Sequence, residues 1–238
     1  MKVICFVNQK GGVGKTASVV NIGAGLAKCG RRVLLIDLDP QESLSYWLGV
    51  GETETTIYEL LAGTCSLNEC VIPHAGGFDI LPSSEMLATL QPDVGQLRQL
   101  LREQRYDYIL LDCSPTLGMI TLAALTAADW VVIPLCPDLL SLKGMSQLLG
   151  TIETIREQTN PALLLRAIVA TRYSARKRMH REVLGQVAQF FEQVPIYTVR
   201  ENIAVAESPV SGKSVLDYRP GSAGAADYLT IAREMANG

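Results

Sequence analysis

One glycine-rich stretch, residues 8–16, carries the side chains of this sequence that are best suited to chemistry. It reads Asn-Gln-Lys-Gly-Gly-Val-Gly-Lys-Thr, after an apolar run over Val3–Val7 and before a helical pattern that begins at Ala17. Glycines let the backbone curl and turn its N–H groups inward, and the N-terminus of a helix attracts anions. Strand, glycine-rich turn and helix together predict a loop that cradles phosphate groups.

The charged residues of this loop indicate a nucleotide with a bound cation. Lys15 would place a positive charge at the β- and γ-phosphates, and Thr16 would offer its hydroxyl to Mg²⁺. Gln9 stands where the general phosphate-loop pattern has a glycine, and Lys10 adds a second lysine inside the loop. The alternative is a strand-to-helix turn with no ligand, but turn chemistry does not account for two lysines and a threonine at this spacing.

Three aspartates follow two other apolar runs. Asp37 and Asp39 end the run that starts at Val33, and Asp112 ends the run that starts at Tyr108. Ligands of open α/β sheets bind at the carboxyl ends of the strands, so these carboxylates are expected at the same edge as the glycine-rich loop. Asp112 would bind Mg²⁺ through a water molecule, opposite Thr16. For the Asp39-Pro-Gln segment, capping of the next helix is an alternative that does not exclude a role in the site.

Short apolar runs alternate with helical patterns, which predicts one domain over residues 1–238. Its fold class is α/β: a doubly wound, mostly parallel sheet with helices on both faces. Segment 49–77 is expected to hold short helices and loops. Strands are expected at Val3–Val7, Val33–Ile36, Phe78–Leu81, Tyr108–Leu111, Trp130–Leu135 and Leu163–Ala170, with a further one at Ile196–Thr198. Helices are expected at about 16–29, 42–48, 55–62, 93–104, 118–127, 141–159, 178–192 and 223–236.

Composition narrows the classes of function. The chain has 238 residues, of which 48% are apolar, and a net charge of −3, so a nucleic-acid site would have to be a local patch. The six cysteines form no C-x-x-C pair and are expected to be reduced, and two histidines are too few for a zinc site. No signal peptide is expected, and no run reaches the roughly 18 apolar residues of a membrane span.

One basic cluster stands out in this acidic chain. Five arginine and lysine residues fall within ten positions, at an expected turn from strand to helix. A contact surface for the phosphate backbone of DNA is the functional interpretation. The alternative is a solvated helix start that pairs with Glu182 or with a partner subunit. The residues are Arg172, Arg176, Lys177, Arg178 and Arg181.

The motifs resemble those of the ParA/MinD family of ATPases over nearly the whole chain. The K-G-G-x-G-K-T loop is similar to the family's deviant phosphate loop, and D-x-D-P-Q at 37–41 is similar to its second nucleotide motif. Ser114-Pro115 stands where the family usually has two prolines, with Gly118 following. Segment 198–209 is similar to the family's adenine loop, although Arg200 replaces a usual proline and Ala204 replaces an arginine implicated in DNA contact.

The resemblance implies roles for individual residues. Lys10 would reach across a dimer to the partner's ATP, Asp39 would position or activate the attacking water, and Asp37 would lie in the outer coordination sphere of Mg²⁺. Lys10, Lys15 and Asp39 would then be catalytic, and Thr16, Asp37 and Asp112 would serve the metal. Nucleotide contacts are implied for Lys10, Gly11, Gly12, Val13, Gly14, Lys15, Thr16, Ala17, Arg200 and Asn202.

The function that the resemblance implies is partition or positioning of cargo. An ATP-dependent homodimer would hydrolyse ATP, bind DNA without sequence preference and respond to a ParB-like partner, and the protein would be cytoplasmic and nucleoid-associated. A MinD-like membrane-cycling ATPase needs a basic amphipathic C-terminal helix, which residues 223–238 do not provide. Two further alternatives are a reductase like the nitrogenase iron protein, with a cluster that bridges the dimer and Cys113 and Cys136 as its candidate ligands, and a small-molecule kinase such as a relative of dethiobiotin synthase.

Overall fold

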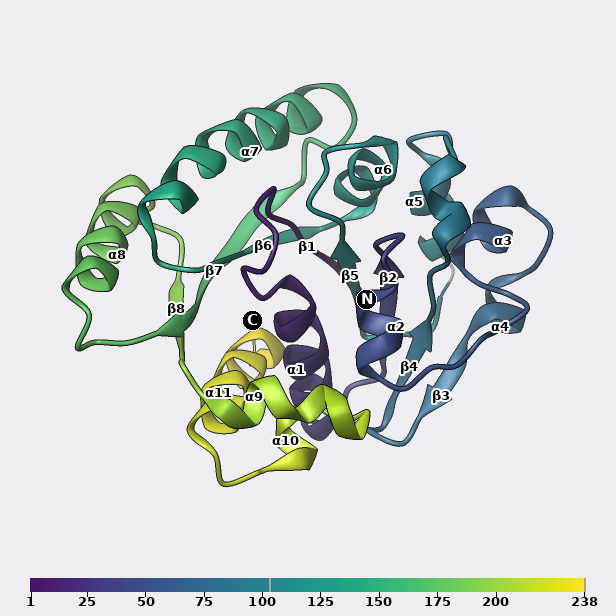
Figure 1. Ribbon diagram of the computed structural model, residues 1–238. Coiled ribbons are helices and arrows are strands. Elements are labelled where there is room, and N and C mark those ends of the chain that lie inside the picture. The colour runs from purple at the N-terminus through teal and green to yellow at the C-terminus, as the bar shows by residue number, and fades with distance from the viewer. Residues whose placement is uncertain (103, 238) are drawn as a thin grey trace.

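The structure is a computed structural model, and it describes residues 1–102 and 104–237. An eight-stranded sheet forms its middle layer, with the strand order β3-β4-β2-β5-β1-β6-β7-β8 (Figure 1). All neighbouring strands are parallel except β3, which pairs antiparallel with β4. The strands are β1 (Lys2–Phe6), β2 (Val33–Leu38), β3 (Ile72–His74), β4 (Phe78–Leu81), β5 (Tyr108–Cys113), β6 (Trp130–Leu135), β7 (Leu164–Tyr173) and β8 (Ile196–Arg200).

Helices cover both faces of the sheet, which confirms the predicted fold class. One face carries α3, α5, α6, α7 and α8, and the other carries α1, α10 and α11 (Figure 1). The helices are α1 (Lys15–Lys28), α2 (Ser43–Trp47), α3 (Ile57–Ala62), α4 (Leu67–Cys70), α5 (Gln96–Arg102), α6 (Met119–Ala127), α7 (Leu139–Gln158), α8 (Arg178–Phe190), α9 (Ile203–Glu207), α10 (Val215–Tyr218) and α11 (Ala223–Asn237), with 3₁₀ turns at Glu85–Thr89 and Ser208–Ser211.

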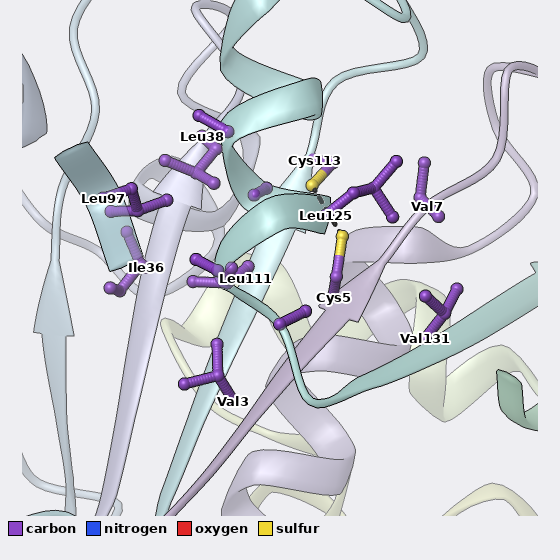
Figure 2. Close-up of a cluster of buried hydrophobic side chains, with 14 of the residues drawn as sticks. Val3, Cys5, Val7, Ile36, Leu38, Leu97, Leu111, Cys113, Leu125 and Val131 are labelled. Carbon is purple, nitrogen blue, oxygen red and sulfur yellow. Dashed lines mark hydrogen bonds between the residues drawn. The ribbon is translucent and has the colours of Figure 1, made fainter. Parts of the chain in front are cut away.

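The sheet is buried on both sides, so its strands read as continuous apolar runs. In β1, Val3 and Cys5 face one hydrophobic core, and Ile4 and Phe6 face the other. This alternation follows from the two-residue period of a strand. Figure 2 shows the first core around Cys5, whose Sγ lies 3.3 Å from Sγ of Cys113 in the neighbouring strand β5.

The strand order places the glycine-rich loop at a reversal point of the sheet. The loop leaves β1, whose two neighbours are β5 on one side and β6 on the other. The chain winds outward in both directions from this point, and a crevice forms there at the carboxyl ends of the strands. The loop and the ends of β2 and β5 therefore lie at one edge, as predicted.

The observed elements differ from the expected ones at their ends and by short elements that were not predicted, which are α9, α10, the two 3₁₀ turns and β3. The helix expected over 93–104 spans Gln96–Arg102, and residues 103 and 238 lie outside the described residues. The helix expected from residue 55 begins at Ile57, because Thr56 is its N-cap and forms a capping box with Glu59 in the first turn. Strand β3 was not predicted, since three residues that pair only with β4 leave no periodic pattern.

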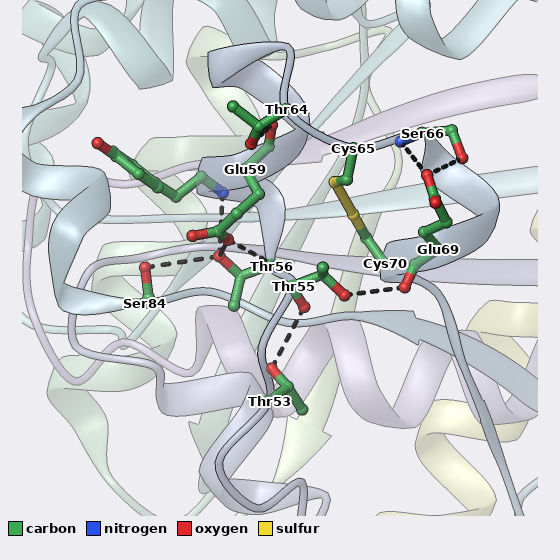
Figure 3. Close-up of a disulfide and its surroundings, with 11 residues drawn as sticks. Thr53, Thr55, Thr56, Glu59, Thr64, Cys65, Ser66, Glu69, Cys70 and Ser84 are labelled. Atoms are coloured by element: carbon green, nitrogen blue, oxygen red, sulfur yellow. Dashed lines mark hydrogen bonds between the residues drawn. A yellow bond between two sulfur atoms is a disulfide. The ribbon is translucent and has the colours of Figure 1, made fainter.

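The expectation that all cysteines are reduced is wrong for one pair. Cys65 and Cys70 are joined by a disulfide that closes a short loop around α4, with their Cα atoms 7.2 Å apart (Figure 3). Sequence spacing did not reveal this pair, because the turn at Ser66 and the capping box of α4 bring the two side chains together. Cys5, Cys29, Cys113 and Cys136 are free thiols.

None of the helices in the described part of the chain combines the length and the apolar character that crossing a membrane requires.

Helix α1 packs closely on α11, and Gly25 lies at a tight point of this contact. A Cβ atom at Gly25 would lie 2.5 Å from Cβ of Ala232 in α11. We expect Gly25→Val to lower the free energy of unfolding by about 2 kcal/mol, because a backbone-proximal methyl group cannot move aside. Denaturant unfolding measures this loss. Gly150→Val is the matched control, since a Cβ at Gly150 in α7 meets no atom within 4 Å, and an equal loss in both variants would contradict the close packing.

Candidate nucleotide site

The glycine-rich loop has the backbone shape that its sequence predicts. Gly12 and Gly14 have φ angles of 69° and 87°, in the region where only glycine is free of strain. Gly14 is the residue before the first turn of α1, so the N–H groups of that turn open onto the loop. The predicted strand, turn and helix are therefore present, and the loop can surround an anion.

Side chains from β7 and from the loop itself hold this shape. The hydroxyl of Thr171 donates to the carbonyl of Val13 at 2.7 Å, and its Cγ2 would lie 3.0 Å from a Cβ at Gly14. Asn8 donates to the carbonyl of Pro134 at 2.8 Å and accepts from the N–H of Lys10 at 3.0 Å. The loop is thus tied to β6 and β7 before any ligand binds.

Lys15 is buried beneath the loop. Its Nζ lies 3.4 Å from the carbonyl of Lys10, and only 8% of the residue is exposed. Burial lowers the pKa of Lys15, while Asp112 and Asp39 act in the opposite direction. A cation held in this position is suited to meet the charge of a bound phosphate group.

The buried carboxylate of Asp112 is suited to a nearby metal ion. It is 1% exposed, and neither carboxylate oxygen has a hydrogen-bond partner. Burial first, and then the charge of Asp37, raises the pKa of Asp112 well above its ordinary value, against an opposing effect of the nearby Thr16 hydroxyl. No group of three or more His, Cys, Asp or Glu side chains within the described ranges could hold a metal alone. The residues fit Mg²⁺, which typically takes one or two protein ligands and completes its shell with phosphates and water.

Both carboxylate oxygens of Asp37 accept hydrogen bonds from neighbouring residues of the protein. Its Oδ1 accepts from the N–H of Asp39 at 3.1 Å, and its Oδ2 accepts from the N–H and the hydroxyl of Ser45 at 2.9 and 2.8 Å and from the N–H of Leu44 at 3.1 Å. Burial raises the pKa of Asp37 to about 6 despite these bonds. Asp37 therefore holds the turn and the start of α2 in place, and any part in metal binding is indirect.

The position of Asp39 is compatible with both of the roles that its sequence context allowed. Its Oδ1 accepts from the N–H of Gln41 at 3.0 Å, which stabilises the turn toward α2. It is only partly buried and lines the same cleft as Lys15 and Thr16. Turn capping and a position next to the phosphates are thus compatible, because one carboxylate oxygen serves the turn.

The two lysines of the loop point to different partners. Lys10 forms an ion pair with Asp138, which also caps α7 by accepting from the N–H of Ser141 at 3.0 Å. Partial burial tends to raise the pKa of Asp138, but the hydrogen bonds from Lys10 and Ser141 outweigh it and leave that pKa below its ordinary value. The Lys10 ammonium group is therefore drawn to the start of α7, while Lys15 stays under the loop.

A cleft of about 610 Å³ extends from the loop to the segment after β8. Asn202 lines it, and its Oδ1 accepts from the N–H of Ala204 at 3.0 Å, so Asn202 caps α9. Arg200 also lines it, but its guanidinium donates to both oxygens of Asp227 in α11. Other residues of this wall lie in segment 198–209, whose motif was recognised but whose wall residues, other than Arg200 and Asn202, were not singled out. They are Ile203, Val205, Ala206 and Pro209, from α9 and the 3₁₀ turn after it. Sequence reasoning missed Ser43 and Trp47 of α2 and Tyr228 of α11, because these residues carry no local motif.

The predicted basic cluster divides into two parts. Arg172 lines the nucleotide cleft and donates to the carbonyl of Gly12, so the structure separates it from the others. Arg176, Lys177, Arg178 and Arg181 lie together at the exposed start of α8. Lys177 pairs with Glu201 at 3.1 Å, and Arg178 pairs with Glu182 at 2.6 Å.

Known proteins are similar to this chain over nearly its full length. Residues 1–165 match a family model described as an AAA domain. The chain is 39% identical to the chromosome partitioning protein ParA of Caulobacter vibrioides, covering 99% of this chain and 94% of that protein. It is 37% identical to the sporulation initiation inhibitor protein Soj of Bacillus subtilis, covering 99% and 98%.

Solved structures show the same fold. A protein from Mycobacterium smegmatis described as cobyrinic acid a,c-diamide synthase, with a bound ATP analogue and magnesium, has a TM-score of 0.85 at 31% identity, covering 99% of this chain and 94% of that one. MinD of Pyrococcus horikoshii, complexed with Mg-ADP, has a TM-score of 0.84 at 25% identity, covering 98% and 95%. With its two-lysine loop, its buried Asp112 and these relatives, the chain belongs to the ParA/MinD family of ATPases, and it is similar along nearly its full length to partition proteins of the ParA/Soj type.

Proposed function

We propose that this chain is an ATP-hydrolysing partition protein that binds Mg-ATP in the cleft and dimerises with it. The observation that carries this proposal is the different placement of the two loop lysines: the Lys15 side chain lies under the loop, and the Lys10 side chain is directed away from it and pairs with Asp138. A single nucleotide needs only the first of them. The second lysine is explained by a partner subunit whose ATP it reaches.

The residues of the cleft supply positioning and charge. Lys15 and the loop N–H groups hold the β- and γ-phosphates, and the Thr16 hydroxyl and Asp112 hold the hydrated metal. When bound, Mg²⁺ neutralises phosphate charge. Asp39 holds a water molecule in line with the γ-phosphate, as its place in the cleft beside Lys15 allows. Asn202 and the wall around it receive the adenine.

DNA is the proposed second ligand of the dimer. Arg176, Lys177, Arg178 and Arg181 are exposed at the start of α8, but Glu201 and Glu182 balance two of these charges. Each subunit alone would therefore make few phosphate contacts. A dimer doubles them, and linked sites bind more tightly than separate ones. We infer that DNA binding requires ATP, has no sequence preference and leads to cargo positioning together with a ParB-like partner, in the cytoplasm on the nucleoid.

A small-molecule synthase is the second candidate, because a structure with that description is 31% identical over 99% of this chain. The two functions differ in what stimulates ATP turnover. A synthase would require its organic substrate, whereas a partition ATPase would turn over without one and respond to DNA and its partner protein. ATP turnover is measured without any organic substrate, first alone and then with DNA added. Turnover that rises with DNA favours the partition ATPase, and no turnover in either case favours the synthase.

The two loop lysines should fail in different ways. Lys15→Ala should weaken ATP binding about 100-fold, or about 2.8 kcal/mol, because the variant lacks a buried, charged hydrogen-bond donor to the phosphates. Lys10→Ala should bind ATP as a monomer but form no ATP-dependent dimer. Calorimetry measures the first effect, and light scattering with a slowly hydrolysed analogue measures the second. Normal dimerisation and turnover in Lys10→Ala would rule out a role for this residue across the interface.

Removal of the Asp39 carboxylate should separate binding from turnover. We expect Asp39→Ala to retain ATP binding and dimerisation and to lose at least about 100-fold in kcat, as is typical when a group that positions or activates the nucleophile is removed. Steady-state phosphate release measures the loss. Asp39→Asn tests the turn: its side-chain oxygen can still accept from the N–H of Gln41, so equal turnover in this variant and in wild type would show that Asp39 only stabilises the turn.

Charge reversal at the start of α8 should weaken binding to any DNA. We expect the double variant Arg176→Glu with Arg181→Glu to bind DNA more weakly. The slope of log affinity against log salt concentration should also become shallower, by about 0.9 for each phosphate that is no longer neutralised. Anisotropy of a random duplex across a salt series, with ATP and with ADP, measures both. Arg102→Glu with Arg105→Glu is the control of equal charge on the α5 side of the sheet. Equal losses in the two double variants would mean that net charge, not this surface, determines binding.

A further inference from the structure

Arg172 has a backbone conformation that side chains rarely adopt. Its φ angle is 50°, and among the described residues only Glu42 shares a positive φ without being glycine. Arg172 also lies where the pairing of β7 with β8 shifts register, between Ala170 and Tyr173. A shift of this kind turns a side chain away from the regular alternation of the strand, and such strained positions are frequent at ligand sites.

The shift brings two successive side chains of β7 against two successive carbonyls of the phosphate loop. Thr171 donates to the carbonyl of Val13, and Arg172 donates through one terminal nitrogen to the carbonyl of Gly12. Thr171 is buried and fixes the loop, as described above. Arg172 is exposed and lines the cleft. Its hydrogen bond to the carbonyl of Gly12 therefore holds the guanidinium group in one position within the cleft.

The charge of Arg172 is not balanced within the described part of the protein. No carboxylate there lies within 4 Å of its guanidinium group, whereas Arg200, on the same cleft, is bound to Asp227. A guanidinium group carries five N–H donors, and the contact with Gly12 uses only one nitrogen. Its planar face and its remaining donors are therefore available to a ligand in the cleft.

We propose that Arg172 is a nucleotide-binding residue that forms one side of the base-binding part of the cleft, between the phosphate loop and the segment after β8. The bond to Gly12 holds its guanidinium plane, and that plane packs on the face of the bound base. Guanidinium groups stack on aromatic rings and attract them electrostatically, and a purine offers the larger face. This inference rests on the proposed binding of ATP, and it assigns Arg172 to the base rather than to the phosphates or to DNA.

Calorimetry of three ligands tests the assignment. Arg172→Ala should bind ATP about tenfold more weakly than wild type, but it should bind inorganic tripolyphosphate equally well, because tripolyphosphate has no base. The preference for ATP over CTP should also shrink, since the purine loses the larger contact. Arg172→Lys should fall between wild type and Arg172→Ala, because it retains the charge and a donor but lacks the plane.

Two further variants separate the side chain from its strained backbone. Arg172→Gly relieves the positive φ angle, so we expect a higher melting temperature than for Arg172→Ala but the same loss of ATP affinity. Arg98→Ala removes an exposed arginine that also donates to a main-chain carbonyl, that of Thr159 at 3.4 Å, and it should bind all three ligands like wild type.

Each remaining outcome would overturn the assignment. Unchanged ATP binding in Arg172→Ala would show that the guanidinium contributes nothing, and wild-type ATP affinity in Arg172→Gly would show that strain alone matters. Equal losses for ATP and tripolyphosphate would place Arg172 at the phosphates. Failure of the proposed function is a separate result, because wild-type protein would then bind no ATP at all.

Discussion

Burial of two carboxylates side by side is the constraint on which the site depends. Asp37 and Asp112 lie opposite each other in register at the ends of β2 and β5, and both are almost fully buried. Like charges in a region of low dielectric cannot both stay ionised without compensation. Asp37 obtains that compensation from the start of α2, whereas Asp112 has only the Thr16 hydroxyl and the charge of Lys15 nearby. The site is therefore incomplete in charge, and a hydrated cation beside Thr16 would complete it.

Buried hydrogen bonds hold the turn after β2 and the glycine-rich loop in place on the two sides of the site. Asp37 fixes the turn that carries Asp39 through its bond to the Asp39 N–H, so the turn cannot drift from the end of the sheet. Thr171 fixes the loop from the other side through the carbonyl of Val13. Both walls of the phosphate site are thus held by buried polar contacts, which cost free energy when they are broken and so keep the geometry fixed before ligand binding.

The sequence predicted the parts of the site that local chemistry determines. Gly14 and Lys15 follow a buried strand and open a helix, and Asp112 ends a strand, so their places follow from parallel-sheet topology. The part of the cleft wall that comes from α11 could not be predicted in this way. Tyr228 comes from the last helix and reaches the cleft only because α11 packs on α1. Arg172 was predicted to belong to the basic cluster, and only the register shift in β7 turns it toward the loop. The Cys65–Cys70 disulfide likewise depends on a turn that has no periodic signal.

One residue connects the cleft with the basic surface at the start of α8. Glu201 lines the cleft and pairs with Lys177, the residue before α8, at 3.1 Å. Its neighbour Arg200 pairs with Asp227 in α11 at 2.7 Å. Adjacency alone is not coupling, since coupling requires an element with two arrangements that both ligands bias. The end of β8 is suited to be that element, because the Lys177–Glu201 pair is exposed on both sides and exchange of such a pair costs little free energy.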